Sequence, residues 1–257
     1  MIGDPPIDAD EYDEERDMAT YVLVHGAWHS GRCWERVVPF LTPAGHRVLT
    51  PSLTGHGDKA HLLGPEVGLD THADDIVRLI TEEELTEVIL VGHSYAGLVI
   101  SSAANQVPDR IAHLVYLDAM VPEDGESAAD VMPVTQVLID RAARSGGGWR
   151  VPPPEPPPSS GLFGVTDPAD VAWLRTMLSD QSVRCLRQPV RLDNPAVNLI
   201  PRTHIHCVAD VPEGYERRPV PAVQPNGSPA QVWELPTGHD CMVTMPAELA
   251  SLLLELG

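Results

Sequence analysis

The feature that most constrains the fold is an apolar run, Val88–Val91, that leads directly into the segment 92–97, Gly-His-Ser-Tyr-Ala-Gly. A stretch rich in small apolar residues, Tyr95–Val107, follows at once and ends at Pro108. This succession of buried strand, tight turn and closely packed helix is typical of the nucleophile elbow, in which a strained turn lifts a serine hydroxyl out of the sheet edge. The small residues at positions 92 and 96 allow the strand and the helix to approach each other. The sequence therefore predicts that Ser94 is a nucleophile at the edge of a parallel sheet.

Apolar runs and helical patterns alternate along the first half of the chain. Four short apolar runs are typical of buried parallel strands: Tyr21–Val24, Arg47–Thr50, Val88–Val91 and His113–Leu117. Helical patterns separate them at Trp34–Leu41, Thr71–Glu84 and Tyr95–Val107. Later patterns predict two more strands and a last helix, at Thr203–Val208, Gln231–Leu235 and Pro246–Leu256. This alternation predicts an α/β domain with a doubly wound, mostly parallel sheet.

Two parts of the chain depart from the alternation. Residues 1–17 contain eight acidic residues and one arginine, so we expect a disordered acidic extension ahead of a folded domain at 18–257. Between about residues 121 and 201 no clear strand pattern is visible, and helical patches, Ala128–Arg144 and Pro168–Leu178, flank the proline-rich segment Pro152–Pro158. Because insertions after strand ends commonly cover a site, we expect 121–201 to form a helical lid.

Charge and cysteine content exclude several kinds of partner. The formal net charge of −20 argues against nucleic acid and anionic membranes, since both require a basic surface. No long apolar run and no signal-peptide pattern is present. The cysteines form no C-x-x-C pair; they are Cys33, Cys185, Cys207 and Cys241. We therefore expect a cytoplasmic protein with reduced thiols, and the sequence leaves its oligomeric state open.

A serine hydroxyl is a weak nucleophile near neutral pH and requires a neighbouring base. The best candidate is His239, because Thr-Gly-His-Asp at 237–240 follows the Gln231–Leu235 strand. Its late position also agrees with the order of the catalytic residues along the chain, which is serine, then acid, then histidine. His204 and His206 share one face of a predicted strand, but no third ligand is near them in sequence. We therefore expect neither a metal nor an organic cofactor.

Two aspartates compete for the role of the acid that orients the His239 imidazole. Asp210 follows the Thr203–Val208 strand, and Asp118 follows the His113–Leu117 strand. Both positions can reach His239 in a sheet of this kind. Chain order and strand placement favour Asp210, with Asp118 as the alternative.

The oxyanion that forms when Ser94 attacks a carbonyl requires two backbone N–H donors. Tyr95, directly after the serine, is expected to supply one, and Ala27, in the loop after the first strand, the other. Gly26 allows this loop to turn tightly, and we expect Gly26 and Trp28 beside the substrate.

Three segments, 22–31 (VLVHGAWHSG), 92–97 and 237–240, together resemble members of the α/β-hydrolase superfamily. They are similar in particular to bacterial esterases related to plant hydroxynitrile lyases and salicylate methyl-ester esterases. The resemblance covers most of the chain from Met18 onward and implies the α/β-hydrolase fold with an inserted lid. In the plant enzymes the acid maps onto Asp210, whereas bacterial relatives often show the sequence Leu117-Asp118-Ala119.

The resemblance also separates two activities. The lyases carry a threonine at the position of Gly26 and a lysine at the position of Asp240, where a carboxylate would repel cyanide. We therefore expect a serine hydrolase that cleaves a small or medium hydrophobic carboxylic ester through an acyl-enzyme on Ser94. The alternatives are a lyase, cyclase or other tailoring enzyme on the same fold, or a ligand-binding member with little turnover.

Overall fold

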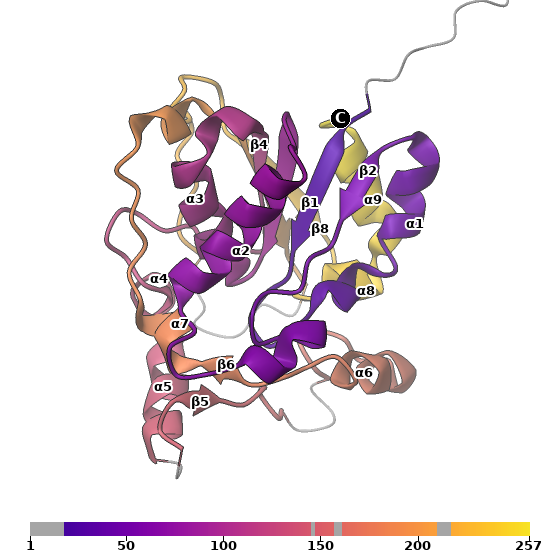
Figure 1. Cartoon of the computed structure of the whole chain (residues 1–257). Coiled ribbons are helices and arrows are strands. Elements are labelled where there is room, and N and C mark those ends of the chain that lie inside the picture. Colours follow the sequence, from indigo (N-terminus) through magenta and orange to yellow (C-terminus); the bar gives the residue numbers. More distant parts are fainter. Residues whose placement is uncertain (1–17, 145–146, 157–160, 210–216) are drawn as a thin grey trace, which may run out of the picture.

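The computed structural model describes residues 18–144, 147–156, 161–209 and 217–257, and its centre is a six-stranded parallel sheet (Figure 1). The strand order is β2-β1-β3-β4-β7-β8. The strands are β1 (Thr20–Val24), β2 (Arg47–Leu49), β3 (Val88–His93), β4 (Ile111–Leu117), β7 (Arg202–Cys207) and β8 (Gln231–Leu235). Strands β1 and β3 are buried on both faces, which explains their unbroken apolar sequences. The predicted doubly wound parallel sheet is confirmed.

Helices cover both faces of this sheet, as Figure 1 shows. One layer contains α2 (Leu69–Glu82) and α3 (Ala96–Gln106), and the other contains α1 (Val38–Leu41), α8 (Cys241–Thr244) and α9 (Pro246–Leu254). The helix predicted at Trp34–Leu41 is instead a 3-10 turn, Gly31–Trp34, followed by the single turn of α1. Pro39 has no N–H to donate, so a continuous helix cannot run through it. Further 3-10 turns are Thr42–Ala44, Gly57–Leu62, Pro108–Arg110 and Pro195–Leu199.

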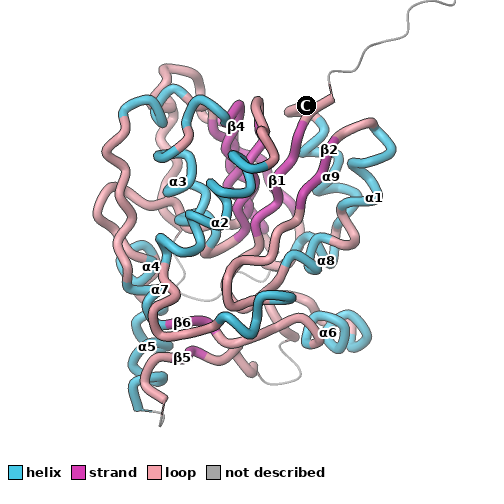
Figure 2. Tube along the Cα trace, in the orientation of Figure 1, coloured by secondary structure: helices cyan, strands magenta, loops and turns pink. Residues whose placement is uncertain are grey.

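The insertion between β4 and β7 lies beyond the carboxyl ends of the sheet strands (Figure 2). It carries α4 (Ala128–Val131), α5 (Val134–Arg144), α6 (Pro168–Arg175) and α7 (Val183–Arg187). The helix expected at Ala128–Arg144 is divided at Met132, whose backbone is extended because Pro133 follows it. The insertion also contains one short antiparallel ladder, β5 (Arg150–Val151) with β6 (Gln181–Ser182), that the sequence patterns did not indicate.

Some expectations fall outside the residues that the structure describes, namely the acidic extension 1–17 and Asp210. Within the described ranges, no helix has both the length and the apolar character needed to cross a membrane.

Candidate active site

Ser94 occupies the turn between β3 and α3 and has a left-handed backbone, with φ of +56°. A side chain at Gly92 would place its Cβ 2.7 Å from the carbonyl oxygen of Ala96, so strand and helix can meet only over a glycine. The Ser94 N–H donates to the Leu117 carbonyl oxygen at 3.2 Å, and the Met120 N–H donates to the Ser94 carbonyl oxygen at 3.0 Å. These bonds fix the turn between β3 and the end of β4. The strand–turn–helix arrangement predicted around Ser94 is present.

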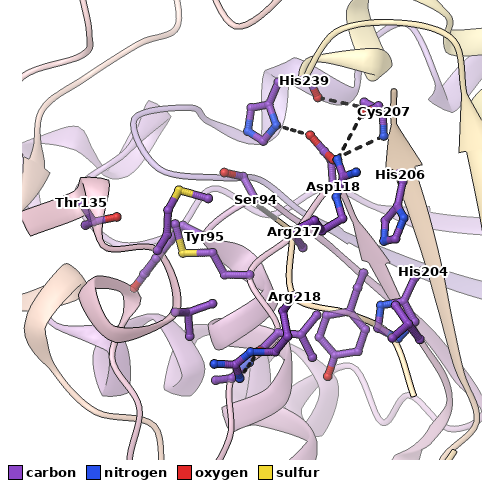
Figure 3. A pocket seen from close by; sticks show the side chains of 18 of the residues that line it. Ser94, Tyr95, Asp118, Thr135, His204, His206, Cys207, Arg217, Arg218 and His239 are labelled. Atoms are coloured by element: carbon purple, nitrogen blue, oxygen red, sulfur yellow. Dashed lines mark hydrogen bonds and ion pairs between the residues drawn. The ribbon is translucent and has the colours of Figure 1, made fainter. Parts of the chain in front are cut away.

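His239 lies in the loop between β8 and α8, and its Nδ1 is 2.6 Å from Asp118 Oδ2 (Figure 3). Asp118 directly follows β4, and its N–H donates to the Ile205 carbonyl oxygen at 2.7 Å. Burial alone would raise the pKa of Asp118, but the contacts with His239 and Arg217 outweigh it and lower this pKa. The structure thus brings Asp118, the alternative acid, to His239.

Arg217 is a neighbour of this pair that no sequence motif indicates. Its Nη2 donates to Asp118 Oδ1 at 2.5 Å and to the Cys207 carbonyl oxygen at 3.1 Å. Asp118 Oδ1 also accepts a bond from the Cys207 N–H at 3.3 Å. Both carboxylate oxygens are therefore held, one by His239 and the other by Arg217 and the β7 backbone.

The loop after β1 approaches Ser94 from the other side. A Cβ on Gly26 would lie 2.9 Å from the Ser94 Cβ, so this close approach requires glycine. Gly26 itself is not among the residues that line the cavity. Ala27, Trp28 and Tyr95 all line the cavity. Among the described residues, no hydrogen bond uses the backbone N–H of Ala27 or of Tyr95. Both groups are therefore available to a ligand at Ser94.

Asp240, next to His239 in sequence, turns away from the cavity and is fully buried. Its Oδ2 lies 2.9 Å from His29 Nε2, while His29 Nδ1 lies 2.8 Å from the Ala27 carbonyl oxygen. Both ring nitrogens of His29 thus face oxygen atoms, an arrangement that favours the protonated ring. Burial would lower the pKa of His29, but Asp240 outweighs it and raises this pKa. The expectation that Asp240 acts on a leaving group in the site is therefore wrong, since its side chain is buried against His29.

A turn of the insertion packs directly on the His239 loop. Phe163 has φ of +52°, and its carbonyl oxygen accepts the Asp240 N–H at 2.9 Å. A Cβ on Gly164 would be 2.5 Å from Gly238 Cα, so the two segments touch backbone to backbone. The Phe163 ring stacks on Trp28, with ring centroids 5.9 Å apart. The insertion thus holds the loops of both His239 and Ala27.

The cavity in front of Ser94 has a volume of about 1180 Å³. Its wall includes Ser94, Asp118 and His239, side chains of the insertion, side chains of β7 and the segment before β8. Figure 3 shows Thr135 on one side of Ser94 and His204 with His206 on the other. No motif in the sequence indicates that the two β7 histidines line the same cavity as Ser94.

One cluster within the described ranges combines possible metal ligands: single ligand atoms of His93, His239 and Asp240 lie within 4.8 Å of one another. His93 Nε2 is 3.0 Å from the His239 carbonyl oxygen, and His239 Nδ1 contacts Asp118. Asp240 also accepts its bond from His29. These protein contacts favour a hydrogen-bonded network at this place.

Comparison with known proteins decides the family. The model of the alpha/beta hydrolase family matches residues 21–252. The chain belongs to this family. The predicted fold and the resemblance to its esterases are thereby confirmed.

Relatives within this family are named as ester hydrolases. A carbendazim hydrolyzing esterase of Nocardioides sp. (strain SG-4G) is 39% identical over 93% of this chain and 100% of its own length. Methylesterase 3 of Arabidopsis thaliana is 28% identical over 95% of this chain and 97% of its own length. Among solved structures, an extracellular alpha/beta-hydrolase from a Paenibacillus species is 26% identical, with a TM-score of 0.77, over 93% of this chain and 99% of its own. That protein is described as sharing structural and functional homology with tobacco salicylic acid binding protein 2.

Proposed function

We propose that this protein is a serine esterase that cleaves a carboxylic ester through an acyl-enzyme on Ser94. The observation that carries the proposal is the 2.6 Å contact between His239 Nδ1 and Asp118 Oδ2, beside a serine held in a left-handed turn. A carboxylate on Nδ1 fixes the imidazole tautomer whose Nε2 can accept a proton. The names of its relatives, which are esterases and hydrolases, support the same reaction class.

In the proposed mechanism, His239 Nε2 removes the Ser94 proton while Oγ attacks the ester carbonyl. Asp118 keeps the ring oriented and stabilises the imidazolium, and Arg217 holds the other oxygen of that carboxylate. The negative oxygen of the tetrahedral intermediate accepts bonds from the N–H groups of Ala27 and Tyr95. The alcohol leaves with the proton from His239, and water activated by the same ring releases the acid.

The cavity supports a medium-sized, largely apolar ester as the substrate. Its volume of about 1180 Å³ is slightly larger than most small-molecule sites, which measure roughly 300 to 1,000 Å³. The apolar part of the wall comes mainly from the insertion, which we propose acts as the lid. Gly164 packs on Gly238, so this corner of the lid is in contact with the His239 loop.

The proposal extends to partners and location. We infer a small-molecule ester substrate and neither a nucleic-acid nor a membrane partner, since the formal net charge is −20. All four cysteines are free and buried, which supports a reducing compartment such as the cytoplasm.

A fluorophosphonate probe tests the proposal because it reacts with serines activated by a neighbouring base. We expect a single adduct on Ser94 by peptide mass spectrometry, no adduct in Ser94→Ala, and hydrolysis of methyl and aryl esters by the wild type alone. A Cys241→Ser variant is the control for a thiol nucleophile and should label normally. A wild-type protein that binds esters tightly but neither labels nor turns them over would contradict the proposal and favour a ligand-binding member of the family.

A further inference from the structure

The two sides of the cavity at Ser94 differ in chemistry. The lid side is mostly apolar, with lining residues that include Val131, Met132, Leu138 and Leu186, and with Glu123 and Thr135 as polar members. The other side includes alternate residues of β7, Arg202, His204 and His206, which share one face of the strand, and the largely apolar segment 219–225. Figure 3 shows His204 and His206 across Ser94 from Thr135 of the lid. We call the part of the cavity along these three residues the β7 arm.

The β7 arm leads away from the proposed catalytic residues along the sheet. His204 pairs with Tyr116 of β4, and their rings stack with centroids 5.3 Å apart. Arg202 pairs with Leu114, four residues before Asp118. At about 3.3 Å per strand residue, the backbone of Arg202 is about 13 Å from the edge where Asp118 meets His239. A group bound by Arg202 is thus remote from the reacting carbonyl.

Three arginines line the cavity, and two of them are paired with carboxylates. Arg217 contacts Asp118 at 2.5 Å, and Arg218 contacts Glu126 at 2.7 Å. In the described part of the chain, no carboxylate oxygen lies within 4.0 Å of the Arg202 guanidinium. Its side chain makes one bond, from Nη2 to the Val197 carbonyl oxygen at 3.4 Å, and its buried Nε has no partner. Arg202 therefore presents a half-buried positive charge with most of its donors unused.

Glu123 and Asp124 line a smaller pocket together with Arg202, but among the described residues neither forms an ion pair with its guanidinium. Burial, then His206 and Arg202, lower the pKa of His204 to about 4, and burial is the largest cause that lowers the pKa of His206. Both rings are therefore neutral near pH 7. The Tyr116 hydroxyl is bonded to Ser101 Oγ at 2.9 Å. Such an uncompensated guanidinium in a partly apolar cavity favours an anion that accepts two parallel N–H bonds.

We propose that the β7 arm binds a carboxylate carried by the substrate at the end remote from the ester, with Arg202 as its partner. This inference rests on the proposed esterase function and names the substrate class: esters that also carry a free carboxylate. A neutral acceptor could take one hydrogen bond from Arg202, but only an anion also neutralises its charge.

Matched ester series test the proposal. The first compares monomethyl esters of dicarboxylic acids of increasing length with methyl esters of monocarboxylic acids of equal length. The second compares acetate esters of ω-hydroxy acids with acetate esters of simple alcohols, which places the carboxylate on the alcohol side. We expect one of the two series to show a preference for the carboxylate. At the best chain length of that series, kcat/KM for the carboxylate-bearing ester should exceed kcat/KM for the neutral ester of equal length by about 10- to 100-fold. A factor of this size is what a charge-assisted hydrogen bond contributes.

Variants of Arg202 assign the preference to this residue. In Arg202→Gln the ratio of the two kcat/KM values should collapse to about one, and in Arg202→Lys it should be intermediate. The backbone of Arg202 pairs with the Gln224 side chain, so these changes leave that strand contact in place. Arg191→Gln, at an exposed surface position, is the matched control and should keep the wild-type ratio.

The outcomes separate this proposal from the esterase function on which it rests. If neutral esters are hydrolysed and neither series favours the carboxylate, the β7 arm proposal is overturned and the esterase function stands. A preference that persists in Arg202→Gln overturns it equally. If no ester is hydrolysed and the fluorophosphonate leaves Ser94 unlabelled, both proposals are overturned.

Discussion

Two histidine–aspartate pairs meet at consecutive residues, and they differ in what surrounds them. His239 with Asp118 faces the cavity, with 30% and 11% of the side chains exposed. His29 with Asp240 is buried, with 2% and 0% exposed. In the first pair the carboxylate holds Nδ1, and no hydrogen bond in the described residues uses the other ring nitrogen. In the second pair both ring nitrogens are bonded to protein acceptors.

A histidine beside an aspartate is therefore not by itself a catalytic base, because its surroundings decide whether a ring nitrogen remains open to a substrate. His239 lines the cavity with one ring nitrogen that makes no hydrogen bond among the described residues, whereas both ring nitrogens of His29 are held by Ala27 and Asp240. The buried pair instead connects the Ala27 loop to the His239 loop. We therefore assign proton transfer to the exposed pair and the spacing of the two loops to the buried pair.

The largest effect on activity should come from replacing each of the two histidines, His239 and His29, in a separate variant. In His239→Gln we expect kcat/KM to fall by about 10⁴-fold or more, with a nearly unchanged free energy of unfolding, because only the proton acceptor is lost. In His29→Gln the free energy of unfolding should fall instead, while Ser94 in the folded fraction still reacts with the fluorophosphonate. Ester hydrolysis and denaturant unfolding measure the two effects. Equal losses of activity in both variants at equal stability would break the distinction.

The buried pair makes a prediction about stability. Asp240→Asn removes the counter-charge of His29 and should lower the free energy of unfolding by about 3 to 5 kcal/mol, because breaking one side of a buried pair leaves an unpaired charge. The control is Asp193→Asn, which removes an exposed partner of Arg191 and should change the free energy of unfolding far less, because solvent screens such a pair. Urea unfolding of both variants is the measurement. A cost for Asp240→Asn no larger than that of the control would contradict the assigned role.

The lid turn on the His239 loop makes a smaller prediction. In Gly164→Ala the new Cβ would meet Gly238 and the His239 N–H, and we expect kcat to fall about 10- to 100-fold because small misplacements of a base are costly. Gly125→Ala is the control, since Gly125 also has a positive φ but no atom near a Cβ. The control introduces a similar backbone strain but should have the kcat of the wild type. Equal kcat in both variants would show that the lid does not position His239.

The smallest effect concerns pH. Burial is the largest cause that lowers the pKa of His56 to about 3 and that of His72 to about 4. A histidine with a lowered folded-state pKa binds its proton more weakly than in the unfolded chain, so stability falls as pH decreases below about 6.5. Between pH 7 and pH 5 the free energy of unfolding should fall less in His56→Gln than in the wild type, by up to about 2 kcal/mol. The exposed His61→Gln should keep the wild-type slope.

His29 should respond to pH in the opposite direction. Because its pKa is raised by Asp240, the stability that the pair contributes is fully present below pH 6.5 and is lost as pH rises through the folded-state value. Unfolding of wild type and Asp240→Asn across pH 6 to 9 measures this loss. A difference between the two proteins that grows with pH would contradict the raised pKa of His29.

The sequence was sufficient for the sheet and for Ser94 because both depend on local patterns. Buried parallel strands are apolar runs, and the elbow needs small residues at fixed positions around the serine. The helices break at Pro39 and Met132 because proline restricts the backbone more strongly than the apolar periodicity favours a continuous helix.

Other parts of the site depend on contacts between distant segments. Asp118 and Asp210 both follow strands whose ends meet at one edge, so periodicity cannot distinguish them. Asp240 follows His239 directly, yet its side chain turns to His29, more than two hundred residues away in sequence. Arg202, Arg217 and Gly164 belong to no motif, and only the folded chain brings them to the cavity or the His239 loop.

The acid partner of His239 is the most direct test of the central claim that Ser94, His239 and Asp118 act together. The measurement is kcat/KM of Asp118→Asn and Asp210→Asn on one ester, with the fluorophosphonate labelling rate of Ser94 in each. We predict a loss of about 10⁴-fold for Asp118→Asn, with labelling slowed in parallel, and values near wild type for Asp210→Asn. A large loss in Asp210→Asn with nearly full activity in Asp118→Asn would contradict the account.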